Sequence, residues 1–276
     1  MDKTFFFMAG LPRSGSTLLS AILNQNPDIM VTASADTTSL MLALYSSSQT
    51  SESYHAGFEP QGYRNVMAKI PESFYSHINK PYIIEKNRNW GTPDYLELAN
   101  MFTKNIKIIA PVRPILEILA SFINLAEQNP NNFIDRFVQD YPFSQYRSRN
   151  DARCDALMAS NKHIEMNTLS IASSLMPQHK NKFHFVAYQD LVSKPEKVIH
   201  AIYDFLKIPK FEHHYQNLKW DLLPNESEVF GIPNLHKIRS KIDASKTDTS
   251  VLSDYVRQKY GHHLDFIFPN GIKNFV

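Results

Sequence analysis

The segment Gly10–Thr17, with the sequence Gly-Leu-Pro-Arg-Ser-Gly-Ser-Thr, restricts the fold of this chain more than any other feature. It follows a short hydrophobic run at residues 4–9 and precedes an amphipathic segment at residues 18–23. A strand, a glycine-bounded turn and a helix in this order direct backbone N–H groups toward one point, where they bind phosphate. The segment therefore predicts an α/β fold whose first strand leads into a phosphate-binding loop.

One side chain of a standard phosphate-binding loop is missing from this segment. Gly10, Gly15 and Thr17 have the spacing of such a loop, but Ser16 stands where a lysine normally follows the second glycine. That lysine contacts the β- and γ-phosphates of ATP or GTP. We therefore expect the loop to hold a nucleotide that has no γ-phosphate.

The loop is nevertheless rich in groups that bind anions. Its two glycines let the backbone approach an anion closely, and the helix that begins near Gly15 adds the positive end of its dipole. Further donors come from the side chains of Arg13, Ser14, Ser16 and Thr17. This concentration of donors favours an anion site over an ordinary corner between a strand and a helix.

The remainder of the chain alternates between strand and helix patterns. Apolar, β-branched or aromatic runs predict strands at residues 82–86, 107–113 and 183–188. Each run precedes a helical pattern, at about 92–103, 114–128 and 190–207. This alternation predicts a parallel sheet with right-handed crossovers.

We expect a P-loop-like, three-layer αβα fold that occupies residues 1–276 as a single domain. A helical insertion is expected at about 130–178, and an irregular segment at about 220–276, where prolines and a glycine interrupt the pattern. The polar stretch 46–53 is expected to be a loop.

Several polar residues lie at the predicted strand ends. Lys86, Arg113 and Tyr188 each end a predicted strand or follow one directly, as Gly10 does. Parallel sheets of this kind bind their ligands at the carboxyl ends of the strands. We therefore expect these residues to share one edge of one sheet.

Arg113 and Ser121 form a second candidate anion site. Pro114 suits the first position of a helix, and Ser121 lies eight residues after Arg113. At ~1.5 Å per residue this spacing is about 12 Å along the helix, so an anion held by both would lie beside the helix. A structural arginine and an ordinary helix serine would fit the same spacing equally well.

Composition excludes some classes of function. With 29 basic and 27 acidic residues, the chain shows no charge excess that would indicate a nucleic-acid or membrane partner. No apolar run is long enough to span a bilayer, and the N-terminus lacks the pattern of a signal peptide. The single cysteine, Cys154, suits a reducing compartment, so we expect a cytoplasmic protein. The pairs His213-His214 and His262-His263 do not have the spacing of a metal site.

Taken together, the loop and the Arg113–Ser121 pair resemble the paired phosphate motifs of the sulfotransferase superfamily. The loop resembles its 5′-phosphosulfate motif, and the second pair resembles its 3′-phosphate motif at the same spacing. Glu85-Lys86-Asn87 is similar to the family's strand-end lysine segment, and Val186–Val192 to a segment whose tyrosine contacts adenosine. The resemblance covers about residues 4–245. The sequence is similar to bacterial members of the superfamily and, more distantly, to tyrosylprotein sulfotransferases. A late segment, Asn234–Arg239, is similar to a Leu-His-Lys-Val-Arg segment of the bacterial group.

The resemblance implies transfer of a sulfuryl group from 3′-phosphoadenosine 5′-phosphosulfate to a hydroxyl or amine by in-line attack, without a metal. This donor has no triphosphate, which accounts for the missing lysine. The resemblance implies that the 5′-phosphosulfate is held by Arg13, Ser14, Gly15, Ser16 and Thr17. It likewise implies that Arg113 and Ser121 hold the 3′-phosphate and that Tyr188 and His236 lie near the adenosine. Lys86 and Arg13 would stabilise the charge that develops during transfer.

The general base does not carry over from the family. Many members have a histidine two residues after the lysine, where this chain has Arg88, which cannot accept a proton. Protein-tyrosine members have a glutamate after their second strand, and the nearest carboxylate here is Asp36. Asp36 is therefore the candidate base, with His55 and His236 as fallbacks.

The sequence leaves the acceptor and two rival functions open. The acceptor, whether a small molecule, a saccharide or a peptide, would contact residues 37–80 and the insertion at 130–178. Aromatic and basic residues suited to an aromatic or anionic acceptor are Tyr141, Phe143, Tyr146, Arg147 and Arg149. The first rival is a small-molecule kinase, which would bind ATP with magnesium. The second is a non-catalytic nucleotide-binding protein of the same fold, which would bind the donor without transfer.

Overall fold

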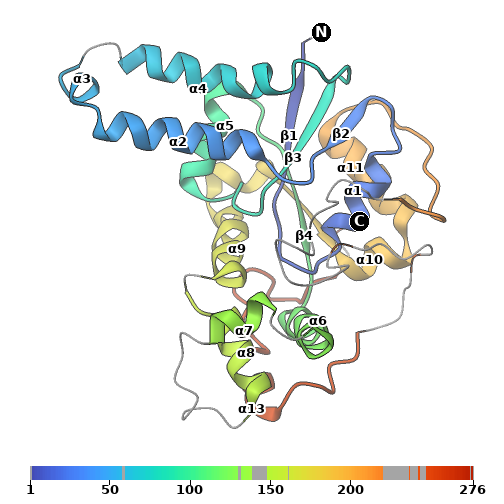
Figure 1. Ribbon diagram of the computed structural model, residues 1–276. Coiled ribbons are helices and arrows are strands. Elements are labelled where there is room, and N and C mark those ends of the chain that lie inside the picture. The colour runs from blue at the N-terminus through green and yellow to red at the C-terminus, as the bar shows by residue number, and fades with distance from the viewer. Residues whose placement is uncertain are drawn as a thin grey trace.

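A five-stranded, fully parallel sheet forms the centre of the molecule in the computed structural model (Figure 1). The structure describes residues 2–57, 60–129, 132–138, 148–160, 162–219, 236, 242, 247–273 and 275, and for His163 the backbone only. The strand order is β2-β3-β1-β4-β5. The strands are β1 (Thr4–Met8), β2 (Ile29–Val31), β3 (Tyr82–Lys86), β4 (Ile108–Val112) and β5 (Phe183–Ala187). The predicted parallel sheet is confirmed, and the short β2 is a strand that the sequence patterns did not predict.

Both faces of the sheet are buried, because successive side chains of each strand point into apolar cores on opposite faces. Phe5 and Phe7 belong to one apolar core, whereas Phe6 and Met8 belong to the other. This alternation follows from the two-residue period of a strand. The first core includes residues of α5 (Pro93–Phe102), α6 (Ile115–Gln128) and α9 (His163–Ala172). The second includes residues of α1 (Ser16–Leu23), α10 (Tyr188–Ser193) and α11 (Pro195–Leu206), so the expected αβα layering is confirmed.

Three helices between β2 and β3 extend away from the sheet at the upper left of Figure 1. They are α2 (Asp36–Thr50), α3 (Glu52–His55) and α4 (Pro60–Phe74). The stretch 46–53 is therefore largely helical, and the predicted loop is wrong there. Met41 of α2 and Met67 of α4 are buried in a small core of their own, which holds α2 in place. The polar side chains are compatible with the helix because Ser48 and Thr50 donate to backbone carbonyls three residues earlier.

The segment predicted as a helical insertion contains α7 (Phe133–Val138), α8 (Arg149–Leu157), α9 and the short 3-10 helices η2 (Ser173–Leu175) and η3 (Pro177–Lys182). A buried ion pair joins the first two helices, because Arg153 donates to Asp135 through two nitrogens at 2.7 and 2.9 Å. Cys154, on the same helix as Arg153, is fully buried, and burial raises the pKa of its thiol.

The carboxyl-terminal part of the chain differs from the expected irregular segment. It contains α13 (Asp254–Tyr260), which Ser253 caps by accepting a hydrogen bond from the backbone N–H of Val256. Val256 and Tyr260 are buried in the core on the α6 face of the sheet, so tertiary packing stabilises this short helix. The helix predicted at 190–207 is likewise divided into α10 and α11, because Pro195 begins a new helix.

Within the described part of the chain, no helix combines the length and the apolar character that crossing a bilayer requires.

Candidate functional site

The loop between β1 and α1 has the backbone geometry of an anion-binding turn. Gly10 and Gly15 have φ angles of 92° and 88°, and Gly15 is the N-cap of α1. A Cβ atom at Gly10 would lie 2.3 Å from the carbonyl oxygen of Pro111, so this position also requires glycine for steric reasons. The loop therefore packs directly against the end of β4, with the first N–H groups of α1 facing out of the helix end.

Gly10→Ala is expected to destabilise the protein more than Gly57→Ala does. Both glycines have positive φ, but a Cβ atom at Gly57 meets nothing within 4 Å. The exposed Gly57 therefore supplies a matched control for backbone strain, which costs about 1–3 kcal/mol. Thermal unfolding should show a lower midpoint for Gly10→Ala, and equal midpoints would contradict the close packing against Pro111.

The serines and the threonine of the loop differ in what they bind. Ser14 is fully buried, and its hydroxyl donates to the carbonyl oxygens of Leu11 and Pro111, the latter at 2.9 Å. The single hydrogen of this hydroxyl is shared between the two carbonyl oxygens. The side chain of Ser14 therefore holds the loop against β4. Ser16 and Thr17 open α1, where backbone N–H groups have no helical acceptor.

Arg13 and Ser121, from the two motifs, meet in the structure. Arg13 Nε donates to Ser121 Oγ at 3.1 Å, across 108 residues of sequence. Arg113 donates from one terminal nitrogen to the carbonyl oxygen of Arg13 at 2.9 Å. The second motif is thus bonded directly to the loop, a contact that the sequence pattern did not predict.

Arg113 is held rigidly at the end of β4. Its Nε pairs with Glu117 at 2.9 Å, and its other terminal nitrogen donates to the hydroxyl of Thr247. The guanidinium also lies over the ring of Tyr188, 4.1 Å from the ring centroid. A guanidinium has five N–H donors, and these bonds together with the bond to the Arg13 carbonyl use three of them. The remaining N–H groups can donate to an anion at a fixed position.

Lys86 ends β3 next to the loop. The sheet register places Lys86 opposite Met8, two residues before Gly10. The backbone N–H of Lys86 donates to Thr32 Oγ1 at 2.9 Å, which joins the ends of β2 and β3. Burial, together with the nearby charge of Arg88, lowers the pKa of Lys86 to about 7. Burial and the charge of Arg13 lower the pKa of Arg88 to about 10. Three cationic side chains are thus gathered at a poorly solvated place, which favours an anion there.

A buried carboxyl group, Glu85, lies beside Lys86 in sequence and was not among the predicted site residues. Glu85 Oε1 accepts hydrogen bonds from Tyr75, at 2.9 Å, and from Thr37. Glu85 Oε2 is buried without a hydrogen-bond partner among the described residues. Burial raises the pKa of Glu85 to about 7, and the charge of Asp36 adds to this effect. The signal in the sequence is an ionisable residue at the same strand face as Ile83, which is buried.

Asp36, the candidate base, is exposed in the first turn of α2. His55, a fallback, lies on the short helix α3, where its Nε2 is 2.6 Å from the carbonyl oxygen of Gln49. His236 lies in a turn and is half-buried, whereas the segments 220–235 and 237–241 beside it lie outside the described residues.

Tyr188 begins α10 and packs on the loop, since a Cβ atom at Gly15 would lie 2.8 Å from its ring. Among the residues suggested for the acceptor, Arg149 pairs with Asp135 at 3.0 Å. The others lie outside the described residues: Tyr141, Phe143, Tyr146 and Arg147.

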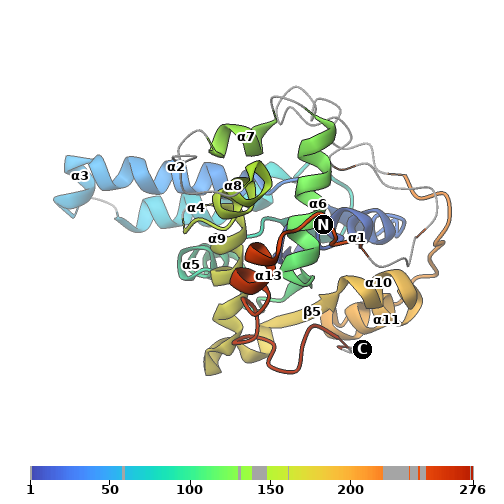
Figure 2. The ribbon, with the colours of Figure 1, turned by 90° about the horizontal axis from the view of Figure 1, so that it is seen from below.

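The candidate residues lie along the carboxyl edge of the sheet in the order of the strands, an edge that Figure 2 views from below. Asp36 follows β2, Lys86 ends β3, the loop follows β1, and Arg113 and Tyr188 follow β4 and β5. The structure therefore brings the strand-end residues to one edge, as expected from a parallel sheet. Their roles toward a ligand remain predictions.

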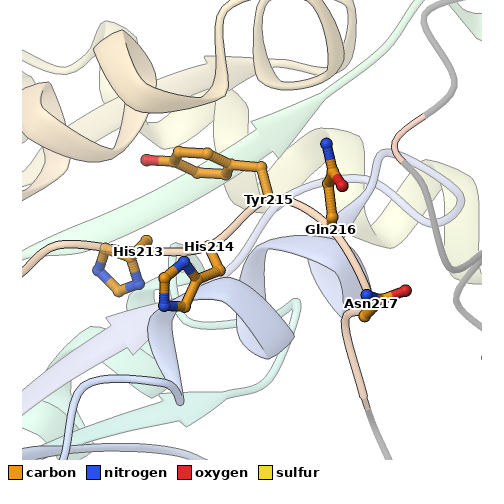
Figure 3. Close-up of a pocket in the computed structure, with 5 residues that line it drawn as sticks. All are labelled: His213, His214, Tyr215, Gln216 and Asn217. Carbon is orange, nitrogen blue, oxygen red and sulfur yellow. The ribbon is translucent and has the colours of Figure 1, made fainter.

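A cavity of about 430 Å³ lies elsewhere, along His213–Asn217 (Figure 3). Gln25, just beyond the last residue of α1, holds this segment by hydrogen bonds of 2.8 Å to the backbone N–H and carbonyl of His214. The cavity thus lies at the end of α1 away from the loop. In the described ranges, no group of three or more His, Cys, Asp or Glu side chains could hold a metal ion.

Comparison with known proteins identifies the family. The sequence matches the model of the Sulfotransferase family over residues 6–213, and the chain therefore belongs to this family. No curated protein matches the sequence significantly.

Solved structures show where this fold recurs. The chain is similar to the sulfotransferase domain from the curacin biosynthetic pathway, with 16% identity, a TM-score of 0.58 and coverage of 99% of both chains. It is similar to the sulfotransferase domain of the Synechococcus PCC 7002 olefin synthase, with 18% identity, a TM-score of 0.59 and coverage of 99% of this chain and 97% of that one. Mouse sulfotransferase SULT7A1, solved as a complex with PAP, is 16% identical over 99% of this chain and 87% of that one, with a TM-score of 0.48. The first two likenesses confirm the fold over the whole length of the chain.

Proposed function

We propose that the chain transfers a sulfuryl group from 3′-phosphoadenosine 5′-phosphosulfate to a hydroxyl or amine acceptor by in-line displacement. The observation that carries this proposal is the bonded unit of Arg13, Ser121 and Arg113. It joins the phosphate-binding loop to a second cationic site, and this donor has two separate anionic groups, the 5′-phosphosulfate and the 3′-phosphate. Family membership supports the same chemistry.

The donor's anionic groups would be divided between the two sites. The 5′-phosphosulfate would accept hydrogen bonds from the backbone N–H groups of Ser14 to Thr17 and from the hydroxyls of Ser16 and Thr17. The 3′-phosphate would accept from the remaining N–H groups of Arg113, with Ser121 beside it. Tyr188 and His236 would lie near the adenosine.

The transfer step needs positive charge on the leaving oxygen and a route for one proton. The acceptor oxygen or nitrogen forms a bond to sulfur while the bond from sulfur to the 5′-phosphate oxygen breaks, and the electron pair stays on the phosphate. Lys86 and Arg13 would stabilise that oxygen. Asp36, which follows the neighbouring strand, would take the acceptor's proton.

A transfer assay tests this function. The protein is incubated with the ³⁵S-labelled donor and panels of phenols, alcohols, saccharides and amines, and labelled products are separated. We expect label transfer to at least one class, and competition by 3′-phosphoadenosine 5′-phosphate. Binding of ATP with magnesium in place of the donor would contradict the proposal and favour the kinase. Tight donor binding without transfer to any class would favour the non-catalytic alternative.

Binding of 3′-phosphoadenosine 5′-phosphate at pH 8 is expected to take up close to one proton. Lys86, with a pKa of about 7, is mostly neutral at this pH, and an adjacent phosphate favours its charged form. Calorimetry in buffers with different ionisation enthalpies measures the proton uptake. Lys86→Met should abolish it, whereas Glu85→Gln should retain it. Uptake that persists in Lys86→Met would contradict the contact between Lys86 and the phosphate.

A further inference from the structure

Arg88 lies in the turn that follows β3, at the edge of the sheet that carries the candidate site. The backbone N–H of the preceding residue, Asn87, donates to the carbonyl oxygen of Met8 at 3.0 Å, directly before the loop begins. Arg88 itself is half-buried. Within the part of the chain that the structure describes, no hydrogen bond or ion pair joins it to another group.

The backbone around Arg88 is fixed by its neighbours. Asn87 Oδ1 accepts from the backbone N–H of Asn89 at 3.0 Å, and Asn89 Oδ1 accepts from Asn167 at 3.2 Å. Gly91 N–H donates to Ser170 Oγ at 2.9 Å. These bonds anchor the turn to α9, so the backbone position from which the Arg88 side chain extends is fixed.

The surroundings of Arg88 are cationic. The charge of Arg13 is near enough to lower the pKa of Arg88, and the charge of Arg88 is near enough to lower the pKa of Lys86. Because the charge of Arg88 is poorly solvated and is repelled by the charge of Arg13, an anion bound beside Arg88 would be favourable. Arg88 thus differs from Arg113, whose guanidinium is already bonded to Glu117.

The position of Arg88 shows which part of the donor it would meet. Arg113 follows β4, Ser121 lies in α6 and Tyr188 begins α10, so all three lie on one side of the loop. Arg88 follows β3, on the other side. The side chain of Asn87 donates to Thr38 of α2 at 3.3 Å, so this turn is bonded to the helix that follows β2. The nucleoside and the 3′-phosphate lie on the first side in the proposed function, which leaves the sulfuryl group and the acceptor on the side of Arg88.

We propose that Arg88 is a catalytic residue that donates hydrogen bonds to the sulfuryl oxygens of the donor. This inference rests on the proposed function and assigns a role to the residue that stands where relatives have a histidine. As sulfur passes from the phosphate oxygen to the acceptor oxygen, Arg88 stabilises the negative charge on the three sulfuryl oxygens. Arg88 takes no proton, and the acceptor's proton still passes to Asp36.

The test compares two ligands that differ only in the sulfuryl group. Calorimetry without an acceptor gives the affinities of Arg88→Gln and Arg88→Lys for 3′-phosphoadenosine 5′-phosphosulfate and for 3′-phosphoadenosine 5′-phosphate. We expect Arg88→Gln to bind the donor about 10- to 100-fold more weakly and to bind the desulfated nucleotide within about twofold of the wild type. We also expect kcat to fall by a similar or larger factor, with partial recovery in Arg88→Lys, which keeps the charge.

Lys104→Gln is the matched control, because Lys104 is exposed before β4 at the opposite edge of the sheet. It removes one positive charge and should leave both affinities unchanged. Thermal unfolding compares the fold of all variants, and Arg88→Lys carries the test if Arg88→Gln is unfolded.

Three results would overturn the inference. Equal weakening of both nucleotides would place Arg88 at the phosphates. A change confined to the KM of the acceptor would place Arg88 in the acceptor site, and unchanged affinities and kcat would leave it without a role. By contrast, a wild-type protein that binds neither nucleotide would refute the proposed function itself.

Discussion

Lys86→Ala is expected to lower kcat for sulfuryl transfer by about 10²- to 10³-fold, while the affinity for 3′-phosphoadenosine 5′-phosphate falls by less than about tenfold. Lys86 ends β3 opposite Met8, so its side chain starts at the edge where the loop begins. In the product the leaving oxygen would be an ordinary phosphate oxygen, which the loop would also bind. We expect Lys86 to stabilise the charge that develops on this oxygen as its bond to sulfur breaks, so the loss of Lys86 should lower the rate more than the affinity.

Steady-state kinetics and calorimetry separate the two effects, with Lys104→Ala as the control for a lost surface charge. The Lys86→Ala variant should be at least as stable as the wild type at neutral pH. Burial lowers the pKa of Lys86 from 10.5 to about 7, so folding disfavours the ammonium form and this penalty is largest below pH 7. The penalty declines as pH rises from about 7 toward 10.5, and the variant should lack this pH dependence. If Lys86→Ala kept wild-type turnover, Lys86 would have no catalytic role.

Arg113→Ala is expected to weaken binding of 3′-phosphoadenosine 5′-phosphate by about 10- to 150-fold, the effect of about 1.5–3 kcal/mol for a charged hydrogen bond. Binding of adenosine 5′-phosphate should weaken much less, because this nucleotide lacks the 3′-phosphate. Some loss is expected for both, since Arg113 also bonds the carbonyl oxygen of Arg13 in the loop.

Ser121→Ala helps to distinguish these contributions. It removes the 3.1 Å hydrogen bond to Arg13 and leaves the guanidinium of Arg113 in place. We expect it to weaken binding of both nucleotides less than Arg113→Ala weakens binding of the 3′-phosphorylated one. Calorimetry with the two nucleotides measures each difference, and equal losses in Arg113→Ala would refute the assignment of the 3′-phosphate site.

Local sequence patterns were sufficient to predict the class of fold. The strands at residues 82–86, 107–113 and 183–188 agree with β3, β4 and β5 to within one residue at each end. The patterns failed where packing outweighs composition. The stretch 46–53 is polar, yet α2 reaches Thr50 because its apolar side chains pack against α4.

The sequence predicted individual residues of the candidate site but not the hydrogen bonds between them. The spacing of Arg113 and Ser121 fitted a phosphate site and an ordinary helix equally well. The structure shows that Ser121 accepts from Arg13 of the loop. Glu85 was not singled out as a site residue. It shares a strand face with the buried Ile83, but the strand pattern does not show that its carboxyl accepts hydrogen bonds from the hydroxyls of Tyr75 and Thr37.

The sequence alone determined the glycine-bounded loop after the first strand and the alternation of strands and helices. Both depend on local properties: glycines at positive φ, and the periods of apolar residues along each element. The tertiary structure decided which side chains meet, because strand order and register bring together residues that are about 100 positions apart, such as Arg13 and Arg113. It also decided that Arg88 and Lys86 share a poorly solvated place beside the loop. The loop with a missing lysine is thereby surrounded by cations from neighbouring strands, and only the folded sheet could place them there.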